Sequence, residues 1–254
     1  MTVPIPVTPR PAAAVVLARE EADHGLVVFM VRRHVGNDFM PDVFVFPGGS
    51  VIEADRQLER VPGLCGPVGA AAPILGTGFH VAALRECFEE AGVLLARRDG
   101  MALPTDAATA TRFASYRTAL HAGVLTLAEI VDQERLTLAT DDLLHWAHWI
   151  TPEVWPKRFD VHFFLGPMPV AQQAAHDQLE TTDGIWISPA EAVARGEAQD
   201  LPIADVTLRQ LQQLSGLRSL AEAHDRFAGK PVPTILPVMI RQDEEWVTIF
   251  PDHS

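Results

Sequence analysis

The chain has 254 residues, of which 48% are hydrophobic, so it can bury the core of one large domain or two small ones. Its 20 lysines and arginines are outnumbered by 33 aspartates and glutamates, and the formal net charge of −13 disfavours a broad contact with a nucleic-acid backbone. The two cysteines lack CxxC spacing and support neither a disulfide framework nor a zinc site. A small anionic substrate remains compatible with this charge, because bound cations can invert the local field.

Neither a targeting segment nor a membrane span is predicted. The first 20 residues lack the basic stretch and long apolar run of a signal peptide. No apolar run approaches the roughly 18 residues that span a bilayer. We therefore expect a cytoplasmic protein without a membrane partner, and the sequence gives no indication of its oligomeric state.

The first third of the chain predicts three strands, a loop and a helix. Short runs rich in β-branched residues predict strands at 12–20 and 25–34, joined as a hairpin, and a third strand at 42–49 that ends in a proline and two glycines. Residues 58–78 contain five glycines and three prolines, which predicts a loop. From 79 to 91 apolar residues recur at spacings of three and four, which predicts a helix.

The remainder alternates less regularly between helices and strands. In chain order we expect a mostly helical stretch at 105–148, a strand at 158–169, a strand and helix at 183–196, an amphipathic helix at 205–227 and a closing strand at 244–251. This irregular order favours an α+β fold or a layered sandwich over a doubly wound sheet.

The helix at 79–91 concentrates acidic side chains on one face. Glu86 lies three and four residues before Glu89 and Glu90, so the three carboxylates are neighbours on a helix surface. They repel one another unless a cation intervenes, and oxygen ligands suit the hard ions Mg²⁺ and Mn²⁺. Arg85 can orient a carboxylate with its planar guanidinium. The alternative is a solvated charged face on a surface helix.

The residues around this helix resemble the Nudix box, G-x5-E-x7-R-E-U-x-E-E-x-G-U with U apolar. Gly49, in the segment FPGG, takes the position of the first glycine, and the second half is matched by Arg85, Glu86, Cys87, Glu89, Glu90, Gly92 and Val93. The sequence departs from the pattern in one residue and in one spacing. Asp55 stands where the family has glutamate, and 29 residues instead of seven separate it from Arg85. The loop at 58–78 accounts for this 22-residue insertion, which costs little because loop closure depends weakly on length.

The resemblance implies an α+β Nudix fold, an α/β/α sandwich with a mixed β-sheet and extra helices. Residues 1–254 would form one Nudix hydrolase domain, with additions at 58–78, 105–148 and 205–227. The implied metal ligands for Mg²⁺ or Mn²⁺ are Glu86, Glu89, Glu90 and the backbone of Gly49. The implied catalytic residues are Arg85, Glu86 and Glu89.

The interrupted box resembles one branch of the superfamily more closely, the Nudix 19 or RP2-like branch. The resemblance is strongest in RECFEEAGVLLAR, HWITPEVWPKRFDVHFFLGPMP and HDQLETTDGIWISPAEA. It implies hydrolysis of CoA or acyl-CoA to 3′,5′-ADP and (acyl-)phosphopantetheine. Two alternatives remain open: a pyrophosphatase for ADP-ribose or NADH, and a nucleotide sensor without catalysis. The intact set of Arg85 and three glutamates argues against the sensor, whereas Asp55 is the feature that favours it.

Four charged residues outside the box are further candidates. Arg158 and Asp160 could contact a substrate phosphate, or could pair with each other at the start of a strand. Glu180, in a predicted loop before a strand, could supply a further metal ligand or the general base, as a loop glutamate does in many Nudix hydrolases, or could be an exposed loop acid. Asp177 is a weaker alternative for that role.

Aromatic and histidine side chains between 145 and 155 have both structural and functional interpretations. His145 and His148 could bind a metal, but no third ligand stands at a recognisable spacing, so we expect packing roles. Trp146, Trp149 and Trp155 could stack on an adenine, although core packing is the commoner role.

Overall fold

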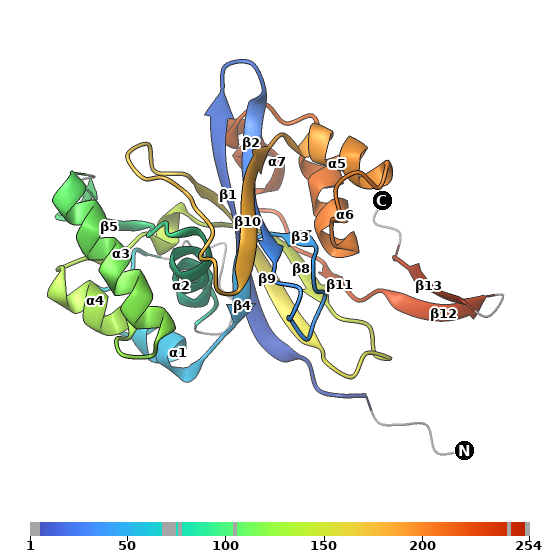
Figure 1. The fold of residues 1–254 in the computed structure, drawn as a ribbon, viewed down its shortest axis with the longest axis horizontal. Helices are drawn as coiled ribbons and strands as arrows, with labels where there is room; N and C mark the ends of the chain where they lie inside the picture. The colour runs from blue at the N-terminus through green and yellow to red at the C-terminus, as the bar shows by residue number, and fades with distance from the viewer. Residues whose placement is uncertain (1–5, 68–74, 76–77, 104–105, 243–244, 252–254) are drawn as a thin grey trace.

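The fold is built on a mixed eight-stranded sheet. The computed structural model describes residues 6–67, 75, 78–103, 106–242 and 245–251. Six strands follow the order β10–β2–β1–β9–β8–β11, with β3 beside β2 and β4 beside β1 (Figure 1). Their bounds are β1 Arg10–Glu21, β2 Gly25–Arg33, β3 Phe44–Val45, β4 Gly48–Ser50, β8 Leu144–Ile150, β9 Phe159–Pro167, β10 Thr181–Ile187 and β11 Thr234–Ile235. The pairs β1–β9 and β8–β11 are parallel, and the other pairs are antiparallel.

Helices cover both faces of this sheet. On one face lie α1 Glu53–Glu59, α2 Phe79–Ala91, α3 Ala107–His121 and α4 Leu127–Gln133, and on the other α5 Pro189–Glu197, α6 Asp205–Leu214 and α7 Leu220–Phe227 (Figure 1). Alternation along β1 serves both layers, because Val15 and Leu17 pack toward α2 while Val16 and Ala18 pack toward the α5–α7 layer. The expected α/β/α sandwich with a mixed sheet is therefore confirmed.

The first predicted strands and the acidic helix are confirmed. The runs 12–20 and 25–34 form the antiparallel hairpin β1–β2, and the helix predicted from residue 79 is α2. The third predicted strand, 42–49, is shorter than expected. It divides into β3 and β4 on either side of Phe46 and Pro47, because proline has no N–H to continue a ladder.

Two predictions of helix need correction. In 105–148 the helices end at Gln133, and the chain continues into β7 Thr137–Leu138, a 3-10 turn at Thr140–Asp142 and the first residues of β8. Antiparallel pairing with β9 makes the end of this stretch a strand. The helix expected at 205–227 is two helices, because Gly216, at φ 91°, lies in the break between α6 and α7.

Two smaller sheets complete the described part of the chain. The first contains β7 together with β5 Ala96–Arg98 and β6 Met101–Ala102. The closing strand predicted at 244–251 is β13 Glu245–Ile249, which pairs with β12 Val238–Gln242, a strand the sequence did not predict.

The predicted loop at 58–78 begins within α1. Of this loop, residues 68–74 and 76–77 lie outside the described residues. Its first part is anchored, because Leu138 accepts a backbone hydrogen bond from Gly66 and donates one to Leu64. Among the helices of the described residues, none is long and apolar enough to cross a membrane.

Candidate active site

Two glycines of β4 let the acidic helix lie directly against the sheet. A Cβ atom on Gly49 would lie 2.4 Å from Glu86 Oε1, and one on Gly48 would lie 2.5 Å from Ala14 Cβ. The Gly48 N–H donates to Glu90 Oε2 at 3.0 Å. The absence of side chains at these positions therefore brings two carboxylates of α2 against the backbone of β4.

The helix α2 separates its apolar and acidic residues as the sequence predicts. Leu84, Cys87 and Phe88 are buried in the core between α2 and the sheet, whereas all three glutamates line a common pocket. Gly92 adopts φ 70° at the C-cap, where its N–H donates to the Phe88 carbonyl.

Arg85 binds three carboxylates at once. Its guanidinium donates to both carboxylate oxygens of Asp55 at 2.9 and 3.0 Å, to Glu86 Oε1 at 2.7 Å and to Glu89 Oε2 at 2.6 Å. A further bond to the Ser50 carbonyl fixes the plane of the fork. Asp55, which replaces the glutamate of the box, is therefore buried in a bidentate ion pair despite the 29 residues that separate it from Arg85.

Burial raises the pKa values of the glutamates. The pKa of Glu86 rises to about 7 because desolvation outweighs the attraction of Arg85, with Glu89 and Glu180 adding repulsion. Burial also raises the pKa of Glu89, and burial with repulsion from Glu86 raises that of Glu90. Burial alone would lower the pKa of Arg85, but the carboxylates around it together hold that pKa above its ordinary value. The cluster therefore stabilises the charged form of Arg85, whereas the glutamates together lack enough positive charge nearby to stabilise their own charged forms.

This donor set fits a hard divalent cation. The glutamates offer carboxylate oxygens, the ligand type that Mg²⁺ and Mn²⁺ prefer, and they face a pocket that could admit water and phosphate. The raised pKa values indicate that the cluster favours added positive charge, which a bound cation would supply.

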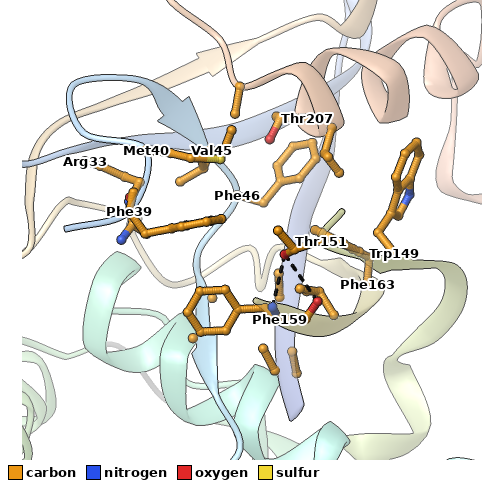
Figure 2. A pocket seen from close by; sticks show the side chains of 18 of the residues that line it. Arg33, Phe39, Met40, Val45, Phe46, Trp149, Thr151, Phe159, Phe163 and Thr207 are labelled. Atoms are coloured by element: carbon orange, nitrogen blue, oxygen red, sulfur yellow. Dashed lines mark hydrogen bonds between the residues drawn. The ribbon is translucent and has the colours of Figure 1, made fainter. Parts of the chain in front are cut away.

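The pocket beside the carboxylates has an apolar, aromatic wall. Its volume is about 500 Å³, and it continues from the acidic end toward β8, β9 and the start of α6. Figure 2 shows Phe39, Phe46, Trp149 and Phe159 around this cavity. Phe39 makes edge-to-face contacts with Trp155 at 5.7 Å and with Phe159 at 5.1 Å between ring centroids. The site therefore joins an acidic end to a wall suited to an apolar or planar group.

Arg33 is the second arginine of this pocket. It lies at the end of β2, where its guanidinium donates to the Phe39 carbonyl at 3.1 Å and to Asn37 Oδ1 at 2.9 Å. Its charge lowers the pKa of Glu90, against the dominant effect of burial. A cation at this position could contact a phosphate without displacing Arg85 from its carboxylates.

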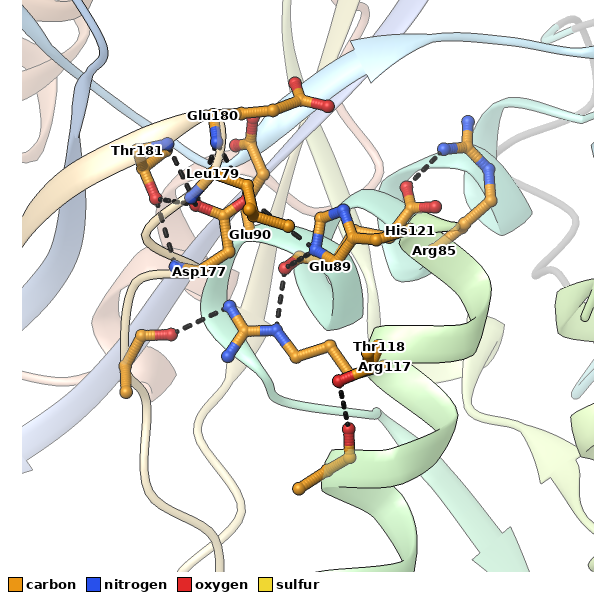
Figure 3. A network of polar contacts seen from close by, with 12 residues as sticks. Arg85, Glu89, Glu90, Arg117, Thr118, His121, Asp177, Leu179, Glu180 and Thr181 are labelled. Atoms are coloured by element: carbon orange, nitrogen blue, oxygen red, sulfur yellow. Dashed lines mark hydrogen bonds and ion pairs between the residues drawn. The ribbon is translucent and has the colours of Figure 1, made fainter. Parts of the chain in front are cut away.

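Glu180 reaches the same pocket from the loop before β10. Figure 3 shows how Asp177 shapes this loop, because its carboxylate accepts hydrogen bonds from the N–H groups of Leu179, Glu180 and Thr181 and from the Thr181 hydroxyl. The Asp177 side chain is 1% exposed, so it is a buried turn-forming group. The geometry therefore gives Asp177 a structural role and leaves Glu180 facing the pocket.

The helix α3 connects this loop to the end of α2. His121 Nε2 lies 2.9 Å from the Glu89 carbonyl and 3.6 Å from Asp177 Oδ2. Arg117 donates to the Glu89 carbonyl at 2.7 Å and to the Ala175 carbonyl at 3.0 Å (Figure 3). Arg117, which lies in the stretch predicted to be helical, thus bonds both the acidic helix and the loop that carries Glu180.

Arg158 and Asp160 lie outside the pocket and have other partners. Arg158 is buried and donates to the backbone carbonyls of Thr151 at 2.9 Å and Val7 at 2.8 Å. Asp160 accepts from His148 instead of pairing with Arg158. Among the described residues, neither side chain lines the cavity that contains the glutamates. We therefore assign neither a substrate contact, because both side chains lie away from the cavity that contains the glutamates.

Sequence reasoning missed the residues of the site that come from distant segments. Arg33 and Phe39 line the pocket, and Arg117 and His121 contact the Glu89 carbonyl. None of them belongs to a local motif, and only the folded chain brings them together. Trp155, considered for adenine stacking, lines the pocket at 36% exposure, whereas Trp146 is buried against Phe227.

Comparisons with known proteins bear on the family of this chain. A family model described as the NUDT19 Nudix domain matches residues 70–214. The putative Nudix hydrolase 7 of Caenorhabditis elegans is 29% identical over 82% of the chain and 61% of its own length, so the chain spans less than two thirds of that relative. The acyl-coenzyme A diphosphatase NUDT19 of Gallus gallus is 26% identical over 88% of the chain and 71% of its own length.

A solved structure shows the same fold. A Nudix hydrolase of Alicyclobacillus acidocaldarius superposes with a TM-score of 0.73 and 24% identity, over 88% of this chain and 99% of that one. The family model covers more than half of the chain. The chain belongs to the Nudix hydrolases, enzymes that act on diphosphate bonds, and it resembles the NUDT19 members among them.

Proposed function

We propose that this protein hydrolyses the diphosphate of CoA or acyl-CoA to 3′,5′-ADP and phosphopantetheine or its acyl form, in one domain that extends over residues 1–254. The observation that carries the proposal is a cluster of buried carboxylates that opens into an aromatic, largely apolar cavity. The acidic end suits a diphosphate with its cations, and the apolar wall suits a pantetheine arm or acyl chain. The names of the Gallus gallus and Homo sapiens relatives, both acyl-coenzyme A diphosphatases, support the same substrate class.

Glu86, Glu89 and Glu90, with the carbonyl of Gly49, would hold the divalent cations that Nudix hydrolases generally use. Such cations, Mg²⁺ or Mn²⁺ here, neutralise phosphate charge and lower the pKa of bound water. Arg85 orients Glu86 and Glu89 by its direct bonds to both, and Asp55 holds Arg85 in place.

Glu180 is the best placed general base. It faces the pocket from a loop, carries no ion pair among the described residues and influences the pKa values of the three box glutamates. A carboxylate there can accept the proton of a water that attacks one phosphorus in line, while the second phosphate leaves. Arg33, at the edge of the same pocket, can bind a non-reacting phosphate oxygen.

A substrate panel separates this proposal from its alternatives. CoA, acyl-CoA esters of increasing length, ADP-ribose and NADH would be incubated with Mg²⁺ and Mn²⁺, and the products identified by mass. We expect kcat/KM to rise about fourfold for each acyl methylene that the wall buries, which corresponds to about 0.8 kcal/mol. All turnover should stop in excess chelator and return when Mg²⁺ or Mn²⁺ is restored.

Trp155→Ala tests the role of the wall. This variant should lower kcat/KM for long acyl-CoA more than for ADP-ribose, while Val154→Ala, at an exposed neighbour that does not line the cavity, should change neither. Preference for ADP-ribose or NADH in the wild-type protein would support the dinucleotide alternative. Binding of a nucleotide without turnover of any substrate would support a sensor instead.

A further inference from the structure

Three potential metal ligands meet on the face of the sheet that is turned toward α2. His148 on β8 and His162 on β9 are direct partners in the β8–β9 register, and Asp160 lies two residues before His162 on the same face. One ligand atom from each residue lies within 4.8 Å of the others. Val161 and Phe163, which alternate with these residues on β9, line the pocket of the proposed active site. The cluster is therefore a separate feature of the fold.

The nitrogen atoms of both imidazoles converge on one carboxylate oxygen. His148 Nε2 lies 2.5 Å and His162 Nε2 lies 3.9 Å from Asp160 Oδ1. The second distance is too long for a hydrogen bond, so His162 Nε2 faces the carboxylate without a direct contact. A cation between these atoms would give all three a partner.

The outer nitrogen of each imidazole is already occupied. His148 Nδ1 lies 2.8 Å from the Thr234 hydroxyl, and His162 Nδ1 lies 3.0 Å from His145 Nε2. Histidines that bind metals usually place their second nitrogen in a hydrogen bond of this kind, which fixes the tautomer and the ring orientation.

The contact between His145 and His162 bears on where the lone pair of His162 points. His162 Nδ1 and His145 Nε2 lie 3.0 Å apart, so one of the two nitrogens donates a hydrogen bond to the other. When His162 Nδ1 is the donor of this bond, the lone pair of His162 lies at Nε2, which faces Asp160.

We propose that His148, Asp160 and His162 form a binding site for one transition-metal dication of the Zn²⁺ class. Imidazole nitrogens suit Zn²⁺, Co²⁺ or Ni²⁺, whereas the all-oxygen cluster of α2 suits Mg²⁺ or Mn²⁺. Water would fill the remaining positions, because the side chains of Asp160 and His148 are 34% and 14% exposed and give the site a solvent entry.

The arrangement of the rings requires one local adjustment. The imidazoles of His148 and His162 are stacked, with centroids 3.9 Å apart and planes 12° apart, so their lone pairs lie in two nearly parallel planes. Sharing one ion needs a turn of a ring about its Cβ–Cγ bond. His148 is the ring that can turn, because His162 is held between His145 and Phe79, whose ring centroid lies 4.4 Å away.

The bound ion would have a structural consequence. It would link β8 to β9 directly, at the residue of β8 that pairs with Thr234 of β11 at the edge of the sheet. Phe79, the first residue of α2, rests on His162, so the site also lies against the start of the acidic helix.

Equilibrium dialysis with Zn²⁺ in excess Mg²⁺ tests the proposal on the full-length protein stripped of metal by a chelator. We expect one tightly bound Zn²⁺ per chain in the wild type and in the control His224→Gln, an exposed histidine of α7. Glu89→Gln should retain this ion, because it alters only the carboxylate cluster. His162→Gln and Asp160→Asn should each bind it on the order of 100-fold more weakly. Zn²⁺ should also raise the Tm of the wild type and of Glu89→Gln but not that of His162→Gln.

Spectra and stability controls complete the experiment. Co²⁺ in place of Zn²⁺ should give a visible absorption band that disappears in His148→Gln. The far-UV circular dichroism of each metal-free variant establishes that it is folded, and Asp160→Asn, which keeps the shape of the side chain, serves if a histidine variant is not. Unchanged Zn²⁺ affinity in folded His162→Gln and Asp160→Asn would overturn the proposal. So would loss of the ion in Glu89→Gln alone, which would place it in the carboxylate cluster.

Discussion

Replacement of Glu86 by glutamine tests whether the buried carboxylates destabilise the fold until a cation binds. The pKa of Glu86 is raised from 4.5 to about 7, chiefly by burial. Below pH 4.5 the group is protonated in both the folded and the unfolded chain, and its contribution to stability is fully present. That contribution is lost as the pH rises through 7, because the folded state then holds a desolvated charge. A shift of this size corresponds to about 3 kcal/mol.

Glutamine keeps the shape and the acceptor oxygen of Glu86 but cannot ionise. We therefore expect Glu86→Gln to gain about 3 kcal/mol relative to the wild type between pH 4.5 and pH 8, in chelator. Urea denaturation at closely spaced pH values, followed by circular dichroism, measures this difference. Glu197→Gln, at an exposed position on α5, should follow the wild type at every pH.

Activity and metal addition complete the comparison. Mn²⁺ should stabilise the wild type at pH 8 more than it stabilises Glu86→Gln, and the variant should lose turnover by orders of magnitude. A stability difference between the two proteins that stays constant from pH 5 to pH 8 would refute the reasoning, since Glu86 would then be ionised in the fold without a cost.

Two further substitutions examine the same cluster. Glu89→Gln should lower kcat on the best substrate by 100-fold or more while the unfolding midpoint stays close to that of the wild type. Rates equal to those of the surface control Glu197→Gln would instead favour a solvated charged face on the helix without a metal-binding role. Asp55→Ala removes the bidentate partner of buried Arg85 and should destabilise the fold by about 3 kcal/mol or more, measured by urea denaturation. An unchanged urea midpoint would mean that the other partners of Arg85 are enough to stabilise its buried charge.

The acidic helix could be predicted because its information is local. The periodicity from 79 to 91 fixes which face is apolar, and spacings of three and four place the glutamates together before any tertiary contact is known. The pairing of Asp55 with Arg85 is different. The match to the box pointed to Asp55, but only the structure shows that the helix α1 brings it within 3.0 Å of Arg85 across the insertion.

The features that were missed depend on strand register and long-range packing. The contacts of His145 with His162 and of His148 with Asp160 could not be predicted from the sequence, because both partners come from β9, opposite these histidines in the sheet. Pairing with β9 also makes the end of the stretch 105–148 a strand. Local sequence preferences do not determine such a strand, because it depends on its neighbours in the sheet. The aromatic wall likewise draws Phe39 and Trp155 from loops far apart in the chain.

The turn that presents Glu180 offers a test of how the loop acts on the reaction. Among the described residues Asp177 does not itself line the acidic pocket, yet its carboxylate accepts four hydrogen bonds, including one from the Glu180 N–H and two from Thr181. Asp177→Asn places an amide donor among these donors and weakens charge-assisted bonds worth about 1.5–3 kcal/mol. We expect kcat to fall on the order of tenfold, with KM little changed, because the loop holds Glu180 less firmly.

A double-mutant cycle decides whether this effect passes through Glu180. If Asp177 acts by positioning Glu180, then Asp177→Asn should slow the wild type but should not slow Glu180→Gln any further. Asp225→Asn, an exposed acid on α7, should leave both backgrounds unchanged. Equal factors of rate loss in both backgrounds would show that Asp177 supports the site independently of Glu180. Because His121 lies 3.6 Å from Asp177 and 2.9 Å from the Glu89 carbonyl, the independent route would then run through α3 to the acidic helix, and His121→Gln should reproduce it.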